Sequence, residues 1–393
     1  MELSHIRRIL LGLTGTAQSV DPQQLNAMNP ADWARLQAMA EMHRLQPWLH
    51  WNKANHPGVP NDILHVWQAA HRRSAMTALV RQTELAECVQ SLRADGFDPV
   101  ALKGAYLAFH AYPEPALRPM RDLDLILPEN QVIPAYDVLR SAGYDLAEAL
   151  TVPIEDCLRF DKHLPLMLAP RGTPVELHKR LSQPDGRLDL DAPHVDEAVL
   201  MDRAMTVDGL SYPVVEDMLA HLIVHAVHGH RLDCGPLILT DIEFLTRQHA
   251  VDWPAFWQRA RHEGWQDGAQ LLFELVRRFH NGKAILRVDS EPAAPPDAIC
   301  ETALDLMLQN LETRRSAKLM GALAEGNLGL VWRRVTGRMA AQGETGTVAD
   351  RSATGGFIHW AVHQAKTGMA QLADREVRAQ SRQHNQFRRW LKD

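Results

Sequence analysis

The sequence lacks the features that mark several specialised classes of protein. It has no apolar run that approaches the ~20 residues of a membrane-spanning helix, so no membrane partner is expected. Its four cysteines are scattered and form no Cys-x-x-Cys pair, which predicts no disulfide framework and favours the reducing cytoplasm. The net charge of −6 argues against a protein that binds nucleic acid in bulk. We therefore expect a cytoplasmic protein for which nucleic acid is not the main partner.

The composition is that of an ordinary globular protein. The chain has 393 residues, of which 46% are hydrophobic and 23% charged, and this length suffices for two or three domains. The charge is uneven, because residues 311–393 hold 14 Lys and Arg against 7 Asp and Glu. Both signs are interspersed in this basic tail. That favours a solvated helix face, with contact to an acidic partner or nucleic acid as the alternative.

The most informative stretch runs from Val100 to Leu127. It begins with three apolar residues, and Lys103-Gly104 then interrupts the run where glycine lets the backbone approach a ligand closely. Residues 105–112 have helical composition, and an irregular connection with three prolines follows. The stretch ends in Asp-Leu-Asp-Leu-Ile-Leu, whose apolar second half predicts a buried strand.

Two carboxylates stand at the mouth of this strand. Side chains alternate along a strand, so Asp122 and Asp124 point to the same face. Two adjacent carboxylates repel each other unless they bind a cation or are solvated. The Asp-x-Asp pattern alone therefore leaves two interpretations, a solvated strand entrance and a metal site.

Neighbouring residues carry a resemblance to a known family. Taken together, Lys103-Gly104, Arg118, Arg121 and Asp122-x-Asp124 resemble the nucleotidyltransferase superfamily that includes DNA polymerase β. Residues 102–127 are more closely similar to a bacterial family of uncharacterised nucleotidyltransferases, which also has the downstream pattern Val175-Glu176-Leu177-His178. The resemblance is strongest over residues 85–181 and says little about the two ends of the chain.

One departure from the wider superfamily concerns the phosphate-binding turn. The superfamily usually has Gly-Ser after its first strand and a shorter gap before the acids. Here Lys-Gly stands in that place, and eighteen positions separate Gly104 from Asp122. The close family shares this feature. The fold inference therefore holds, but the details of phosphate binding do not transfer from well-studied polymerases.

The order of predicted elements indicates an α+β fold. Helix, strand, helix, strand, helix, strand, strand implies a small mixed β-sheet with helices packed on it, similar to the nucleotidyltransferase core. From residue 188 onward we expect mostly helix. The predicted division is an N-terminal helical region (1–82), the core (83–182), a helical region packing on the core (183–290) and a C-terminal helical region with the basic tail (297–393). Residues 343–356, rich in Gly, Thr and Ala, are expected to form a loop.

The resemblance implies a set of site residues. Nucleotidyl transfer commonly uses two Mg²⁺ ions held by carboxylates, which stabilise charge on the phosphoryl oxygens. The residues that carry over are Asp122 and Asp124 as ligands of both ions, Glu176 as the third carboxylate, Lys103, Gly104, Arg118 and Arg121 as binders of the nucleotide phosphates, and His178 as a contact of the acceptor. Because residues alternate on a strand, Glu176 and His178 share a face. Without the resemblance, a solvated sheet face is an equal alternative for this pair.

Three histidines form a second candidate cluster. His221, His225 and His228 lie at i, i+4 and i+7 of a predicted helix over 218–231, on one face. Histidines four apart can hold a metal, but no His-Glu-x-x-His motif is present. Packing against the sheet, with some contact to substrate, is the favoured interpretation.

The leading hypothesis is a Mg²⁺-dependent nucleotidyltransferase. It would transfer a nucleoside monophosphate from a nucleoside triphosphate, expected to be ATP, to a hydroxyl or similar group of a small-molecule, sugar or peptide acceptor, in a biosynthetic pathway. The alternatives are a kinase with the same metals, a non-catalytic nucleotide-binding or scaffold protein on this fold, and an RNA-modifying or toxin–antitoxin-type transferase.

Overall fold

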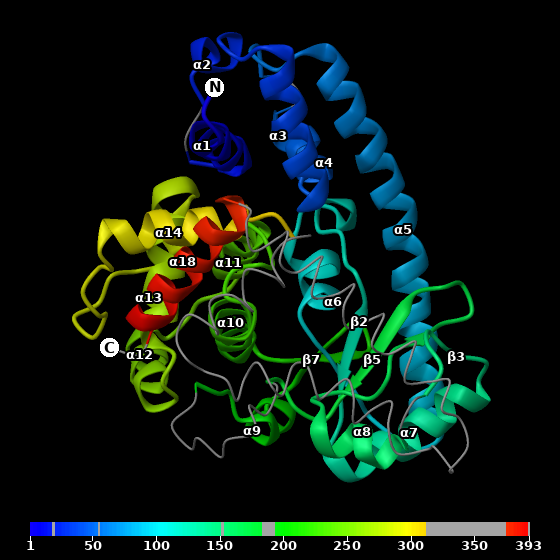
Figure 1. Cartoon of the computed structure of the whole chain (residues 1–393). Coiled ribbons are helices and arrows are strands. Elements are labelled where there is room, and N and C mark those ends of the chain that lie inside the picture. The colour runs from blue at the N-terminus through cyan, green and yellow to red at the C-terminus, as the bar shows by residue number, and fades with distance from the viewer. Residues whose placement is uncertain (18–19, 54–55, 151–152, 183–192, 312–374, 392–393) are drawn as a thin grey trace, which may run out of the picture. The chain divides into compact units, whose positions relative to one another are not determined.

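The computed structural model describes the chain except residues 18–19, 54–55, 151–152, 183–192, 312–374 and 392–393 (Figure 1). The chain divides into two compact units, Met1–Cys300 and Glu301–Asp393, which are taken separately below. The four regions predicted from the sequence remain a prediction beside this division. No described helix has both the length and the apolar character needed to cross a bilayer.

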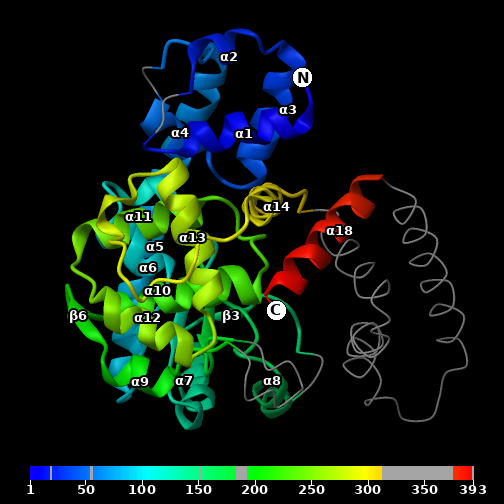
Figure 2. The ribbon, with the colours of Figure 1, turned by 90° about the vertical axis from the view of Figure 1, so that its left-hand side faces the viewer.

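The first unit begins with five helices, and the first four gather at one end of it (Figures 1 and 2). Their bounds are α1 Leu3–Thr14, α2 Pro22–Asn26, α3 Pro30–Met42, α4 Gln46–Lys53 and α5 Asn61–Ala94. A capping box between Asn29 and Asp32 starts α3, with Pro30 in its first turn. The long α5 runs from these helices down to the sheet, so it links the N-terminal end of the unit to the core.

A seven-stranded mixed sheet forms the centre of the unit, as the sequence predicts. The spatial order is β3-β4-β5-β2-β1-β7-β6. The strands are β1 Val100–Ala101, β2 Leu123–Ile126, β3 Asp145–Leu146, β4 Met167–Leu168, β5 Pro174–His178, β6 Met205–Val207 and β7 Leu210–Tyr212. The central strand β2 is buried throughout, pairs antiparallel with β1 and parallel with β5, and so places the two acidic motifs side by side.

The described residues after 188 are mostly helical, as the sequence predicts, but one segment forms strands. Strands β6 and β7 form a hairpin that extends the sheet beyond β1. Its turn is Asp208-Gly209, and both residues have positive φ (48° and 78°), as a tight hairpin turn requires. Each strand has three residues, too few for an alternating pattern to stand out. The Asp-Gly pair was the available signal.

Helices cover the sheet, which lies between the lower part of α5 and α10 (Figures 1 and 2). After β1 come α6 Gly104–Tyr106, a π-helical turn η1 Leu107–Ala111 and a 3₁₀ turn η2 Pro115–Leu117; α7 Glu129–Ser141 and α8 Ile154–Phe160 follow β2 and β3. The rest are α9 Glu197–Asp202, α10 Val215–Ile223, π-helical η3 Val224–Gly229, α11 Leu237–Gln248, α12 Trp253–His262, α13 Gln266–Phe279 and η4 Gly282–Ala284. The predicted helix over 218–231 is therefore α10 continued by a π-helical segment.

The second unit is described only in part. Helix α14, Asp297–Met307, begins in the first unit and ends in the second, and α18 spans Arg375–Trp390. His384 of α18 lies 3.0 Å from the Gln309 side-chain oxygen, which ties the two described pieces together. The predicted loop at 343–356 and most of the basic tail fall outside the described residues.

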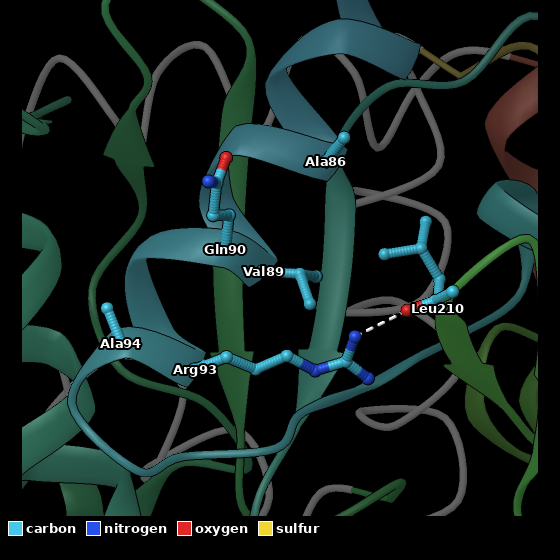
Figure 3. A pocket seen from close by; sticks show the side chains of 7 residues that line it. Ala86, Val89, Gln90, Arg93, Ala94 and Leu210 are labelled. Carbon is cyan, nitrogen blue, oxygen red and sulfur yellow. Dashed lines mark hydrogen bonds between the residues drawn. The ribbon is translucent and has the colours of Figure 1, made fainter.

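A shallow groove lies where α5 approaches the β6–β7 hairpin (Figure 3). Its lining is mostly apolar, with Val89 and Leu210 facing each other. Arg93 crosses it and donates to the Gly209 carbonyl and, at 3.1 Å, to Ser211 Oγ. The charged side chain in the groove is thus already paired, and none of the acidic site residues lines it.

Candidate active site

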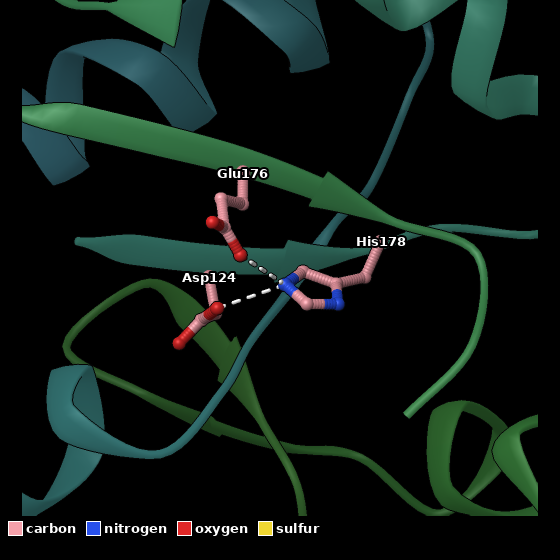
Figure 4. Close-up of side chains that lie close together, drawn as sticks. All are labelled: Asp124, Glu176 and His178. Carbon is pink, nitrogen blue, oxygen red and sulfur yellow. Dashed lines mark hydrogen bonds and ion pairs between the residues drawn. The ribbon is translucent and has the colours of Figure 1, made fainter. Parts of the chain in front are cut away.

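The register of β2 and β5 brings the acidic motifs together. Asp124 stands opposite Glu176, and Ile126 stands opposite His178. In Figure 4 both carboxylates point toward one ring nitrogen of His178. His178 Nε2 lies 2.8 Å from Asp124 Oδ1 and 3.2 Å from Glu176 Oε2, and the ligand atoms of the three residues lie within 4.8 Å of one another. Two residues that are far apart in the sequence thus share one potential cation site.

Lys103 and Gly104 lie beside the same strand. The Leu102 amide donates to the Asp124 carbonyl at 2.9 Å, and Lys103 Nζ lies 3.2 Å from Asp124 Oδ2. Lys103 has φ 46°, a left-handed backbone that a residue with a Cβ adopts at some cost. A Cβ on Gly104 would lie 2.8 Å from Met120 Cγ, so glycine is required for this approach. The strained turn holds the amine on the buried carboxylate.

The two aspartates titrate in opposite directions. Burial raises the pKa of Asp122 to about 6, and the negative charge of Asp124 adds to this effect. Burial also opposes ionisation of Asp124, but Lys103 and the hydrogen bond from His178 outweigh it and hold its pKa well below the ordinary value. Asp124 is therefore already compensated by side-chain cations, whereas Asp122, which has no ion-pair partner in the described part of the chain, ionises only against the cost of its burial.

Glu176 and His178 stabilise each other's charged forms. Burial would raise the pKa of Glu176, but the hydrogen bond from His178 and the nearby His163 lower it. Burial would lower the pKa of His178, and its hydrogen bonds to Asp124 and Glu176 raise it instead. His178 is 1% exposed, and its ring nitrogen Nε2 lies between the two carboxylates, where a metal ion could also bind.

The two arginines of the predicted site lie in different surroundings. Arg118 forms a bidentate pair with Asp241, at 2.8 Å from Nε to Oδ1 and 3.0 Å from Nη2 to Oδ2. The Tyr112 hydroxyl donates to the same carboxylate at 2.7 Å. Arg121 is exposed beside Asp122. Arg118 thus anchors α11 to the loop before β2, and phosphate binding by either arginine remains a prediction.

Comparison with known protein families identifies the family of this chain. The model of the family described as "Uncharacterised nucleotidyltransferase" matches residues 29–281. The chain belongs to that family. A search of curated proteins gave no match, and a search of solved structures gave none either. The family range includes α3 to α5 as well as the sheet, so the N-terminal helices are part of what the nucleotidyltransferase family shares.

Two further residues lie at the site and were missed by the sequence analysis. His163 pairs across a short bridge with His178, and its Nε2 lies 3.6 Å from Glu176 Oε2. Lys162 feels the charges of Asp124 and Glu176, and burial lowers its pKa. Both precede β4 in an irregular segment, where no periodicity marks them. The one sequence feature that could have indicated them as site residues is the Lys-His pair directly before a predicted strand.

The three histidines of α10 and η3 do not form a comparable group within the described part of the family fold. His221 is buried, and burial holds its pKa and that of His225 well below the ordinary value, with Lys103 adding to the effect. Burial lowers the pKa of His228 to about 4. The three rings are therefore neutral near pH 7. Packing of this helix against the sheet, with some contact to substrate, remains the favoured interpretation.

Proposed function

We propose that the protein is a Mg²⁺-dependent nucleotidyltransferase. It transfers a nucleoside monophosphate from a nucleoside triphosphate, with ATP as the expected donor, to a hydroxyl or similar group on a small-molecule, sugar or peptide acceptor in the cytoplasm. The observation that supports this most is the pairing of Asp124 with Glu176 across β2 and β5, with Asp122 two residues before Asp124. Family membership supports the transfer class.

The residues at the site fit Mg²⁺. This ion prefers carboxylate oxygens. Asp124 and Glu176 supply them on two neighbouring strands, and Asp122 lies directly before β2. The raised pKa of Asp122 points the same way, since a carboxylate that is costly to ionise gains most from an added cation. When bound, Mg²⁺ would neutralise charge on the transferring phosphate and on the leaving pyrophosphate.

Side chains of the protein itself take the other roles in the transfer reaction. The acceptor oxygen forms a bond to the α-phosphorus, and the bond from that phosphorus to the β-bridging oxygen breaks. Glu176 is the more exposed of the paired carboxylates, and it accepts the acceptor's proton. Lys103 stands at the start of α6, where its amine and the backbone amides meet the phosphates. His178 orients Asp124 and Glu176 and lies within reach of an acceptor group.

Thermal unfolding with ATP, GTP, CTP and UTP, each with and without Mg²⁺, tests the donor site. Asp124→Asn keeps the volume of the side chain and removes the charge that faces Lys103 and His178. We expect one triphosphate to stabilise the wild type only with Mg²⁺, and Asp124→Asn to lose that shift. Slow turnover to a nucleoside monophosphate and pyrophosphate, read by mass, supports nucleotidyl transfer. A nucleoside diphosphate with orthophosphate indicates a kinase. Equal shifts in wild type and variant would contradict the proposal.

A further inference from the structure

Three arginines near Asp122 form no ion pair in the described part of the chain. Arg44 lies in the turn between α3 and α4, Arg81 on α5, and Arg121 directly before Asp122. None of them makes an ion pair or a side-chain hydrogen bond with any residue in the described part of the chain, whereas Arg118 is fully paired with Asp241. The Nε of Arg81 is buried and has no partner there. Half-buried guanidinium groups without partners are costly.

The position of Arg81 follows from its neighbours on α5. Ser74, Arg81 and Glu84 are seven and three residues apart, so they share one face of the helix. Ser74 Oγ donates to the Ala116 carbonyl in η2 at 2.7 Å. The buried Glu84 accepts from the amides of Arg171 and Thr173 in the β4–β5 turn. Arg81 therefore faces the space between η2 and β5, where the chain enters β2 at Asp122.

Arg44 reaches the same space from the N-terminal helices. Helices α4 and α5 both pack on η2, and Figure 1 shows α4 directly above the α6 region. Arg44 has φ 57°, a left-handed conformation at the end of α3 that turns the chain into α4. Strain of this kind in a residue other than glycine is concentrated at functional sites.

The charges of the three side chains act on one another. Burial lowers the pKa of Arg44 to about 10, and repulsion by Arg121 and Arg81 adds to it, while Asp122 opposes the shift. Burial also lowers the pKa of Arg81, and Asp122 is the first charge that opposes it. Glu84 opposes the shift of Arg81 as well, but it already accepts from the amides of Arg171 and Thr173. Asp122 is itself assigned to a metal ion, so these two acids do not balance three arginines. An anion from outside the chain would balance them.

We propose that Arg44, Arg81 and Arg121 form a phosphate-binding subsite beside Asp122, built largely from the N-terminal helices. Planar guanidinium groups match the oxygens of phosphate in pairs, which makes arginine suited to this ligand. The inference rests on the proposed function, which assigns the neighbouring Asp122 to the metal site. It adds to that function a binding site for a phosphate group of a substrate. The phosphate belongs either to the polyphosphate tail of the donor or to a phosphorylated acceptor.

Calorimetric titration with inorganic tripolyphosphate tests the subsite. The titrations use the full chain without divalent metal, at low salt, with Arg44→Gln, Arg81→Gln and Arg121→Gln. The matched control is Arg73→Gln, which makes the same change on an exposed position of α5, eight residues before Arg81. We expect each of the three variants to weaken binding by about tenfold or more, and the control by less than about twofold. Arg121 is exposed, so its variant keeps the fold even if Arg44→Gln does not.

Further titrations use a nucleoside triphosphate, the matching monophosphate and glycerol 3-phosphate. They distinguish a phosphate of the donor from a phosphate of the acceptor. If Arg81→Gln weakens binding of the triphosphate but not of glycerol 3-phosphate, the subsite belongs to the donor. Weaker binding of glycerol 3-phosphate, with the triphosphate unchanged, assigns it to the acceptor. Equal tripolyphosphate binding by the wild type and the three variants, or an equal loss in Arg73→Gln, would overturn the subsite. These equilibria involve no turnover, so a failed transfer assay would leave them interpretable.

Discussion

The acids of β2 and β5 and the histidines of α10 and η3 both have the regular spacing of a ligand set, but within the described residues the acids, and not these histidines, belong to a group of close ligand atoms. Parallel strands in register place Asp124 and Glu176 at one level, on neighbouring strands about 4.8 Å apart. Residues spaced i, i+4 and i+7 follow a helix face over two turns. The rings of His221 and His225 pack edge to face with their centroids 5.9 Å apart. His228 lies against Gly268 of α13.

The two groups also differ in how their charge is compensated. The acids hold their charge, because Lys103 and His178 lie within 3.2 Å of Asp124. The histidines are neutral near pH 7. The Nε2 atoms of His221 and His228 are buried without a hydrogen-bond partner in the described part of the chain. Spacing alone therefore does not identify a site. The compensation of the charged form distinguishes a site from a packed core.

The largest expected difference is in turnover. Glu176→Gln removes one carboxylate charge from the acidic group and should lower Mg²⁺-dependent triphosphate turnover by about 10²–10³-fold. His225→Ala, in the other group, should lower it by less than about tenfold. Turnover is measured as pyrophosphate release, with circular dichroism to show that both variants are folded. A larger loss in His225→Ala than in Glu176→Gln would break the comparison.

A smaller effect is expected on stability. The pKa of Asp122 is about 6 in the folded chain and 3.8 for an unperturbed carboxyl, so the unfolded chain releases this proton first as pH rises. The wild type without metal should therefore lose up to about 3 kcal/mol between pH 4 and 6.5. Asp122→Asn lacks this group, so it should unfold at higher denaturant concentration than the wild type at pH 7.5.

The control for this prediction is the same pair of proteins at pH 4, where Asp122 is protonated in the folded chain. The two should then have similar stability, because a protonated carboxyl and an amide are both neutral. Saturating Mg²⁺ at pH 7.5 should reduce the difference by stabilising the wild type. A wild type more stable than Asp122→Asn at pH 7.5 without metal would contradict the assignment of Asp122 as a carboxyl that is costly to ionise.

The smallest effect is expected at His228. Its ring is neutral near pH 7 and its Nε2 has no described partner, so His228→Leu removes little besides a polar atom. We expect the free energy of unfolding to change by less than about 1 kcal/mol. Content of Zn²⁺ or Ni²⁺, measured by mass spectrometry after incubation and washing, should not change. Loss of a bound metal in His228→Leu would restore the metal interpretation of the helix.

The sequence predicted the central strands well, because their signals are local. Asp122-x-Asp124 before an apolar run and Val-Glu-Leu-His were both read as strands, and the α+β class was confirmed. The parallel register that pairs Asp124 with Glu176 depends on the path of the chain between the two strands, and no local pattern encodes it. The resemblance to the family supplied that expectation.

What the sequence did not reveal is the partner of each charge. Arg118 stands where the pattern favours a phosphate contact, but its guanidinium lies on Asp241, far along the chain. Arg44, in the turn between α3 and α4, and Arg81, on α5, lie in a region that gave no chemical signal. The packing of α4 and α5 on η2 brings them toward Asp122. Their role depends on tertiary contacts, which residue spacing does not predict.

The most direct test of the central claim is anomalous scattering from crystals grown with Mn²⁺ and a non-hydrolysable triphosphate. Mn²⁺ replaces Mg²⁺ on carboxylate oxygens and its position can be located unambiguously. The account predicts metal bound to Asp122 and Asp124, with Glu176 contributing to the same site. Metal held by His221 or His225, with the three carboxylates uncoordinated, would contradict it.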